Sequence, residues 1–136
     1  MIEIDDIIEL KTNTETERLS FETRYLVLIN FTFDLTVLSE GFSGTAHFCV
    51  RREQIEKMCA DLTNMHLKLT GTTILDDNDS DGFVEFENEP NGRLNVSGQV
   101  GGSLEDHFLK FKFETDQTCI PQFVQDFKSL LKYQDD

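Results

Sequence analysis

The chain has 136 residues, with 26 acidic and 12 basic side chains, and its formal net charge at pH 7 is −14. Such a charge repels phosphate backbones and anionic lipid surfaces, so it argues against nucleic-acid and membrane partners. A basic protein partner is favoured instead, because opposite charges speed encounter. Acidity that only maintains solubility is the alternative interpretation. The length is typical of one domain, and we expect a single domain over 1–136.

The N-terminal segment has no basic stretch followed by a long apolar one, so it does not look like a secretory signal. The longest apolar run, Tyr25–Ile29, is too short to cross a membrane. Cys49, Cys59 and Cys119 are odd in number and form no CxxC pair. Thiols without a pairing pattern are typical of a reducing compartment, and we therefore expect a cytoplasmic location.

Strand signals dominate the first third of the chain. An apolar start over 2–10 predicts a strand with a break at Asp5 and Asp6. Alternating apolar and polar residues predict one long strand over Tyr25–Leu38, with Phe31 and Phe33 on its apolar face. A turn at Glu40 and Gly41 then leads to a strand over 42–50.

The hydrophobic period changes to that of a helix after residue 50. A stripe of apolar residues predicts an amphipathic helix, and it consists of Ile55, Met58, Cys59, Leu62 and Met65. Four strand signals follow at 72–75, 83–87, 93–100 and 107–114, with Asn91-Gly92 predicting a tight hairpin. A second apolar stripe predicts a closing helix in which Phe123 and Phe127 are buried against the sheet.

The resulting order is three strands, a helix, four strands and a helix. Sequential strands with short connections pair antiparallel, so the predicted class is α+β. We expect one twisted antiparallel sheet of about seven strands with the two helices packed against it.

An acidic segment connects two of the predicted strands. Asp77, Asp79, Asp81 and Gly82 match the first half of a calcium-binding EF-hand loop, but Asn88 occupies the twelfth position, where a bidentate Glu is needed. We therefore predict no calcium site. A solvated hairpin tip is one alternative, and an acidic surface for a basic partner is the other. Residues 76–89 hold seven acids and no base, which we predict to bind the partner: Asp76, Asp77, Asp79, Asp81, Glu85, Glu87 and Glu89.

Few other residues indicate chemistry. His47 and Cys49 share a strand face, and Cys59 and His66 share a helix face, so each pair could form half of a zinc site or a Cys–His nucleophile. Buried core cysteines are the commoner interpretation. Cys119 precedes the last helix, where a helix N-terminus can lower a thiol pKa, but no base is evident nearby. The sequence predicts no cofactor, no metal and no enzyme activity.

A set of short segments gives the chain a recognisable pattern as a whole. These segments are Phe42-Ser43-Gly44, 67–71, 73–75, 84–86, 92–98 and 109–118. The pattern resembles the small bacterial proteins grouped with WapI-type immunity proteins, over about residues 22–133. The resemblance implies a cytosolic antidote that binds the toxic domain of a contact-dependent or secreted toxin and performs no reaction itself.

Two other functions stay open on the residues alone. One is a small-molecule-binding or regulatory module that uses the concave face of the sheet, and the other is an enzyme. The oligomeric state is not predicted by any of these patterns.

Overall fold

The computed structural model describes residues 1–102 and 106–136. Within these residues there are two α-helices and nine strands, so the predicted α+β class is confirmed. The strands form two antiparallel sheets rather than one. The first sheet contains β1 (Ile2–Glu3), β2 (Ile7–Leu10), β3 (Glu17–Val27), β4 (Asn30–Ser39) and β5 (Phe42–Arg51). The second contains β6 (Thr72–Asp76), β7 (Phe83–Asn88), β8 (Arg93–Gly101) and β9 (Phe108–Asp116).

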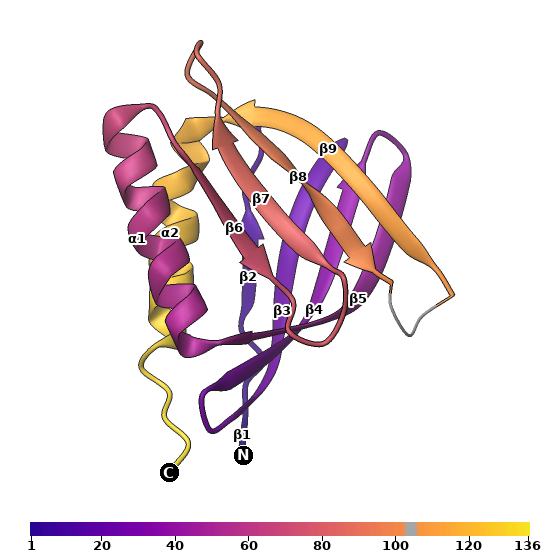
Figure 1. Ribbon diagram of the computed structural model, residues 1–136, viewed down its shortest axis with the longest axis vertical. Coiled ribbons are helices and arrows are strands. Elements are labelled where there is room, and N and C mark those ends of the chain that lie inside the picture. The colour runs from indigo at the N-terminus through magenta and orange to yellow at the C-terminus, as the bar shows by residue number, and fades with distance from the viewer. Residues whose placement is uncertain (103–105) are drawn as a thin grey trace.

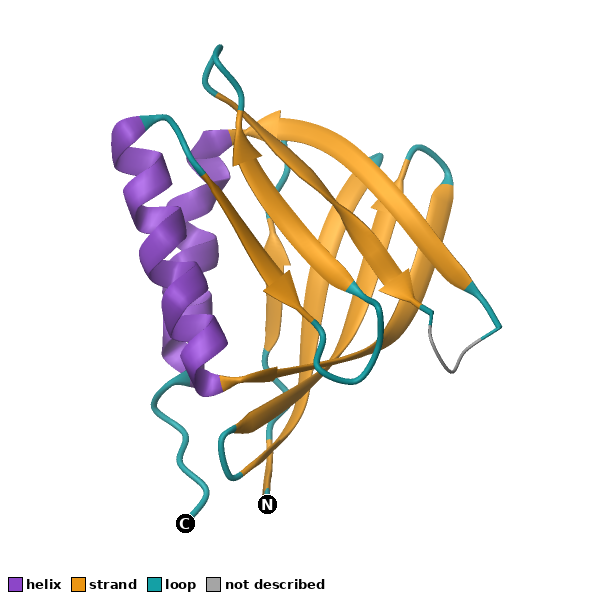
Figure 2. Cartoon of the chain, viewed as in Figure 1, coloured by secondary structure: helices purple, strands orange, loops and turns teal. Residues whose placement is uncertain are grey.

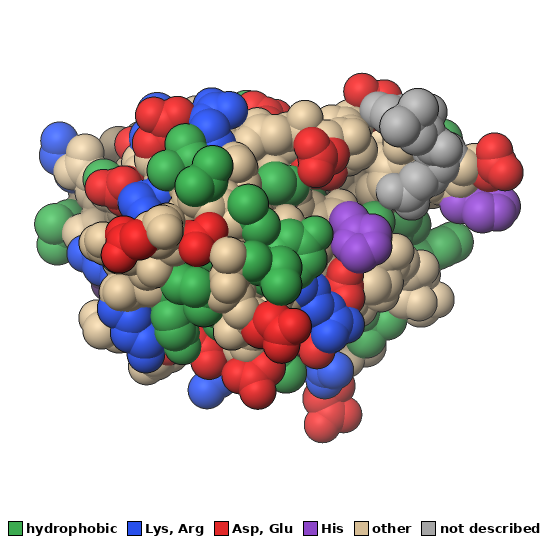
Figure 3. All heavy atoms as spheres, turned by 90° about the horizontal axis from the view of Figure 1, so that it is seen from below, with side chains coloured by type: hydrophobic (Ala, Val, Ile, Leu, Met, Phe, Trp, Pro, Cys, Tyr) green, Lys and Arg blue, Asp and Glu red, His purple; other side chains and the backbone are tan. Residues whose placement is uncertain are grey.

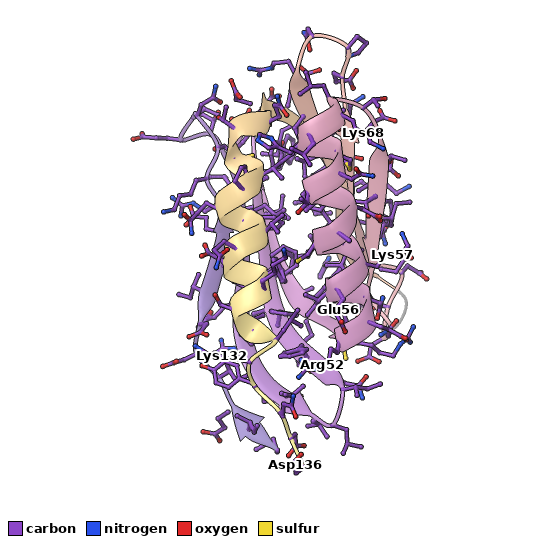
Figure 4. The ribbon with its side chains drawn as sticks, turned by 90° about the vertical axis from the view of Figure 1, so that its left-hand side faces the viewer. Arg52, Glu56, Lys57, Lys68, Lys132 and Asp136 are labelled. Carbon is purple, nitrogen blue, oxygen red and sulfur yellow. The ribbon has the colours of Figure 1, made fainter. Side chains whose placement is uncertain are left out.

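Helix α1 (Arg52–Lys68) joins the two sheets, and a short 3₁₀ turn, η1 (Gln117–Cys119), leads from β9 into α2 (Ile120–Leu130). The two helices lie side by side and cover one flank of both sheets (Figures 1 and 4). Figure 2 shows the sheets as the larger part of the molecule, with the strands of the two sheets facing each other. None of the described helices is long and apolar enough to cross a membrane.

One hydrophobic core lies between the sheets and the helices, and phenylalanine dominates it. Phe123 and Phe127 of α2 are buried, as predicted, and their ring centroids lie 5.0 Å apart in an edge-to-face arrangement. Phe127 also meets Phe21 of β3 at 5.1 Å, and Phe123 meets Phe86 of β7 at 5.7 Å. Helix α2 therefore contributes to the packing of both sheets.

The strand expected over Tyr25–Leu38 is wrong, because the chain reverses at Leu28 and Ile29. Strands β3 and β4 pair through Val27 and Asn30, which leaves a two-residue turn between them. The inward residues change accordingly: Phe31 and Phe33 are buried as expected, whereas Tyr25, Val27 and Ile29 of the expected apolar face are exposed. Leu26 of β3 and Phe31 of β4 pair across the turn and are both buried, so the phase of the alternation changes there. A pattern that assumes one continuous strand contains no such change and assigns Tyr25 and Val27 to the wrong face.

The remaining connections follow the sequence more closely. The Glu89–Gly92 segment forms the turn between β7 and β8, in which Gly92 has a φ of +81°. The first predicted strand is divided into β1 and β2, each paired with β3, and the chain between them includes Asp5 and Asp6.

A candidate partner-binding surface

The second sheet has an inner face that packs on the core and an outer face that carries acids. Strand β7 alternates between buried Val84 and Phe86 and the outward-facing Glu85 and Glu87. Asp76 is the last residue of β6 and is exposed. This alternation places Glu85 and Glu87 on the solvent side of the sheet, opposite the side that packs on the core.

The loop between β6 and β7 is held by hydrogen bonds to its neighbours. The backbone N–H of Asn78 donates to the carbonyl of Cys49 at 2.9 Å, and the Asn78 amide donates to Gln54 Oε1 at 2.8 Å. The Gln54 amide in turn donates to the carbonyl of Asp76 at 3.0 Å. These bonds connect the loop to the edge of β5 and to the first turn of α1, so its backbone is ordered without any partner.

Asp77 has a structural position and is not solvated, as it would be in the solvated hairpin tip that the sequence leaves as one alternative. Its side chain is only 7% exposed. One carboxylate oxygen accepts the backbone N–H groups of Cys49 at 2.9 Å and Asp79 at 3.0 Å, and the other accepts the Ser80 hydroxyl. All of these hydrogen bonds are made within the protein, so little of the Asp77 carboxylate is available to a partner.

The other six predicted acids face solvent wholly or in part. We call them the acidic surface, which consists of Asp76, Asp79, Asp81, Glu85, Glu87 and Glu89. They do not converge on one point. Asp79 and Asp81 lie in the loop before β7, and Glu89 lies in the turn after it, so the surface is a strip about 20 Å long. A strip of this shape fits an extended protein surface better than a small ligand.

Basic residues limit the acidic surface on one side. Glu85 pairs with Ser97 of β8, which pairs with Lys112 of β9, so this lysine lies two strands away from the glutamate on the same face. Lys110, two residues before Lys112 on β9, lies on the same face. The outer face therefore carries acids along β6 and β7, whereas β9 carries Lys110 and Lys112 followed by Glu114. A sequence count over 76–89 could not show these neighbouring lysines.

The cysteines are all free thiols in environments that do not favour reaction. Burial raises the pKa of Cys59 to about 11 and that of Cys119 to about 12. At Cys119, loss of solvent outweighs any effect of the helix N-terminus that it precedes. His66 hydrogen-bonds to Gln117, at 3.1 Å, and is not paired with Cys59.

His47 and Cys49 share the outer face of the first sheet, as their spacing predicts, but His47 Nδ1 lies 3.2 Å from Asp34 Oδ1. Among the residues that the structure describes, no three His, Cys, Asp or Glu side chains are placed to hold a metal ion. The absence of calcium from the β6–β7 loop stays a prediction, to be tested by titration.

A hollow of about 740 Å³ on the outer face of the first sheet is the strongest alternative site. Arg24, Asp34 and His47 line it, together with the N-terminal segment. Arg24 binds the Asp34 carboxylate at 2.6 Å, and this hydrogen bond raises the pKa of Arg24 above its ordinary value. Asp34 therefore already binds both Arg24 and His47 within the hollow.

The fold and the outer face define a class: a two-sheet α+β domain with two helices on one flank and an acidic exposed hairpin. A family model described as "Immunity protein WapI-like family" matches residues 11–134, and the chain belongs to this family. The resemblance expected from the sequence is thereby confirmed, and family membership supports an immunity role and implies a toxin partner.

Comparison with solved structures supports the fold alone. The chain is similar to a solved structure titled "Crystal structures of trypanosoma bruciei MRP1/MRP2", with a TM-score of 0.57 and 8% sequence identity. The similarity covers 94% of this chain and 83% of that one. No curated protein matches the sequence.

Proposed function

We propose that the chain neutralises a cognate bacterial toxin by binding its toxic domain stoichiometrically, without a reaction of its own. The family match over residues 11–134 carries this proposal. From the net charge of −14 we further infer that the partner is a basic protein domain, because opposite charges favour association. We place the encounter in the cytoplasm, where three unpaired cysteines are stable.

The acidic surface is the contact that we propose for this partner. Its acids stand on a hairpin whose loop is fixed to β5 and α1 by backbone and side-chain hydrogen bonds. Binding therefore orders little additional backbone, and the entropic cost of association is small. Acids on the strip complement the basic cleft of the toxin and occlude it from an anionic substrate. Lys110 and Lys112 mark the edge of the contact on β9, because like charges repel there.

Two measurements test this function with the full chain. The tagged chain is used to recover its partner from the native host, and the recovered toxin domain is then expressed separately. Co-expression with the chain should restore growth that the domain alone prevents, and the two should form a complex of fixed stoichiometry by light scattering. Growth arrest despite a saturating amount of the chain would contradict the proposal, as would failure of the purified proteins to associate.

The hollow on the first sheet supports a second candidate function, the binding of a small molecule. Native mass spectrometry of the chain purified from its host separates the two candidates. A mass that fits the chain plus a small ligand would favour the second, and the mass of the chain alone would favour the first.

A further inference from the structure

The turn between β3 and β4 breaks the ordinary rules of hairpin sequences. Leu28 has a φ of +55°, and its side chain is 64% exposed. Ile29 beside it is 51% exposed. Positive φ favours Gly, Asn or Asp, and neither folding nor solubility requires two large apolar side chains at an exposed tip. We call Leu28 and Ile29 the hairpin tip.

The hairpin at the other end of β4 provides the contrast within the same sheet. There the turn consists of Glu40, with a φ of +50°, and Gly41, with a φ of +88°. Both turns thus hold a residue other than glycine at positive φ, but the exposed side chain is charged in this turn, and its second residue is glycine. The two turns of β4 therefore differ in polarity, because only the Leu28–Ile29 turn exposes two large apolar side chains.

Two residues far away in the sequence hold the hairpin tip in place. The Asp135 carboxylate accepts the backbone N–H of Leu28 at 2.8 Å and the N-terminal ammonium group at 3.0 Å. The backbone N–H of Arg52 donates to the carbonyl of Ile29 at 2.8 Å. The Arg52 guanidinium is fixed in turn by the carbonyls of Leu131 and Tyr133. Figure 4 shows Arg52 at the base of α1, above the tail that ends at Asp136.

The surroundings of the hairpin tip combine apolar and acidic side chains. A hollow of about 370 Å³ beside it is lined by Leu28, Ile29, Arg52, Gln134, Asp135 and Asp136. Glu3 and Asp5 line the larger hollow on the first sheet, whose floor includes the partly exposed Tyr25. Figure 3 looks at this end of the molecule and shows hydrophobic side chains among acidic ones.

The hairpin tip and the loop of the acidic surface lie at the same end of the molecule (Figure 1). Both are fixed to the start of α1, the tip through the Arg52 backbone and the loop through the Gln54 side chain. One partner surface can therefore meet both, with the loop carrying charge and the tip carrying apolar area.

We propose that the hairpin tip is the apolar anchor of the toxin interface and inserts into an apolar recess with a basic rim on the toxin domain. This inference rests on the proposed function. Charge complementarity favours the toxin domain as the molecule that binds the tip, because the acids around the tip favour a recess with a basic rim. Large side chains that fill a pocket at the centre of an interface dominate affinity, and a tip that is ordered beforehand loses little entropy on binding.

The test uses single variants of the full chain and the separately expressed toxin domain. Leu28→Asn introduces a residue that tolerates positive φ and removes the apolar side chain. Ile29→Ser removes the second apolar side chain of the hairpin tip. Each should weaken binding by about tenfold or more, mainly through faster dissociation. The thermal unfolding midpoint of Leu28→Asn should be unchanged or higher than that of the wild type, because Asn adopts this backbone conformation readily.

Two control variants match these changes away from the tip. Glu40→Asn alters the other positive-φ hairpin, and Leu67→Gln removes a leucine that is 75% exposed near the far end of α1. Both should leave the affinity within twofold of the wild type. Wild-type affinity in both tip variants, with the wild type binding the domain, would overturn the inference and leave the proposed function intact. No binding by the wild type would overturn both.

Discussion

The carboxylate of Asp77 accepts the backbone N–H of Cys49 at 2.9 Å, which ties the β6–β7 loop of the second sheet to the edge strand of the first. The neighbouring backbone bond from Asn78 to the Cys49 carbonyl, also 2.9 Å, completes the pair. The first acid of the loop thus links the two sheets at this point, while the acids after it face solvent.

This arrangement predicts opposite behaviour for adjacent acids. Asp77→Ala should lower the free energy of unfolding by about 2 kcal/mol, because it leaves buried donors without their charged acceptor. Asp79→Ala should change it by less than about 0.5 kcal/mol, since this side chain is exposed. Urea denaturation of both variants measures the difference. Equal losses would show that the Asp77 hydrogen bonds do not stabilise the loop.

The phenylalanine core predicts a large cost for truncation in α2. Phe123→Ala and Phe127→Ala should each cost about 3–5 kcal/mol, because both rings are buried and each contacts several others. Phe42→Ala is the matched control, since that side chain is 69% exposed, and it should cost less than about 0.5 kcal/mol. Equilibrium denaturation distinguishes them. Losses below about 1 kcal/mol at both helix positions would contradict the packing of α2.

The buried thiols predict slow reaction in the folded state. At pH 8, Cys59 and Cys119 should resist a thiol reagent such as DTNB until the chain unfolds, because burial keeps both protonated. Counting the thiols that react before and after addition of denaturant tests this. Full reaction of all three cysteines at one rate in the native state would contradict it.

The same thiols predict how stability changes in alkali. Their folded pKa values, about 11 for Cys59 and about 12 for Cys119, exceed the ordinary value of 9.0. Their contribution is therefore complete below pH 9 and is lost as the pH rises through 11 and then 12. The double variant Cys59→Ala, Cys119→Ala should show a shallower fall in stability above pH 9 than the wild type.

The hydrogen bond between Asp135 and the hairpin tip predicts a titration at low pH. The hydrogen bond from Leu28 and the nearby N-terminal ammonium group lower the pKa of Asp135 below its ordinary value of 3.8. The stabilising contribution of the Asp135 carboxylate is thus complete above pH 3.8 and is lost as the pH falls through the lowered pKa. The amide resonance of Leu28 should follow this titration by NMR and should not follow it in Asp135→Asn. An unchanged profile in the variant would show that another group holds the tip.

Much of the fold follows from periodicity, and the errors have physical causes. The helices and the hairpins of the second half are marked by apolar stripes and turn residues, so they could be predicted. The turn at Leu28 and Ile29 carries no turn residue, and its backbone is fixed instead by Asp135 and Arg52, which are distant in sequence. A local pattern does not contain such contacts.

The candidate site divides in the same way. Charge counting identifies the acids of 76–89, and the alternation of β7 places Glu85 and Glu87 outward. The burial of Asp77 depends on Cys49, a residue from the other sheet, and the lysines that limit the surface come from β9. The hairpin tip was not identified because an apolar pair inside an alternating run looks like part of a strand.

The central claim, that a basic toxin domain is bound through the acidic surface, is tested most directly by association rates. The variant Asp79→Asn, Asp81→Asn, Glu87→Gln neutralises three exposed acids of that surface. The control Glu15→Gln, Glu40→Gln, Glu56→Gln neutralises three exposed acids outside the second sheet. At low salt the first should associate about tenfold more slowly than the control, and the two rates should converge at high salt. Equal rates for the two variants at low salt would contradict the account.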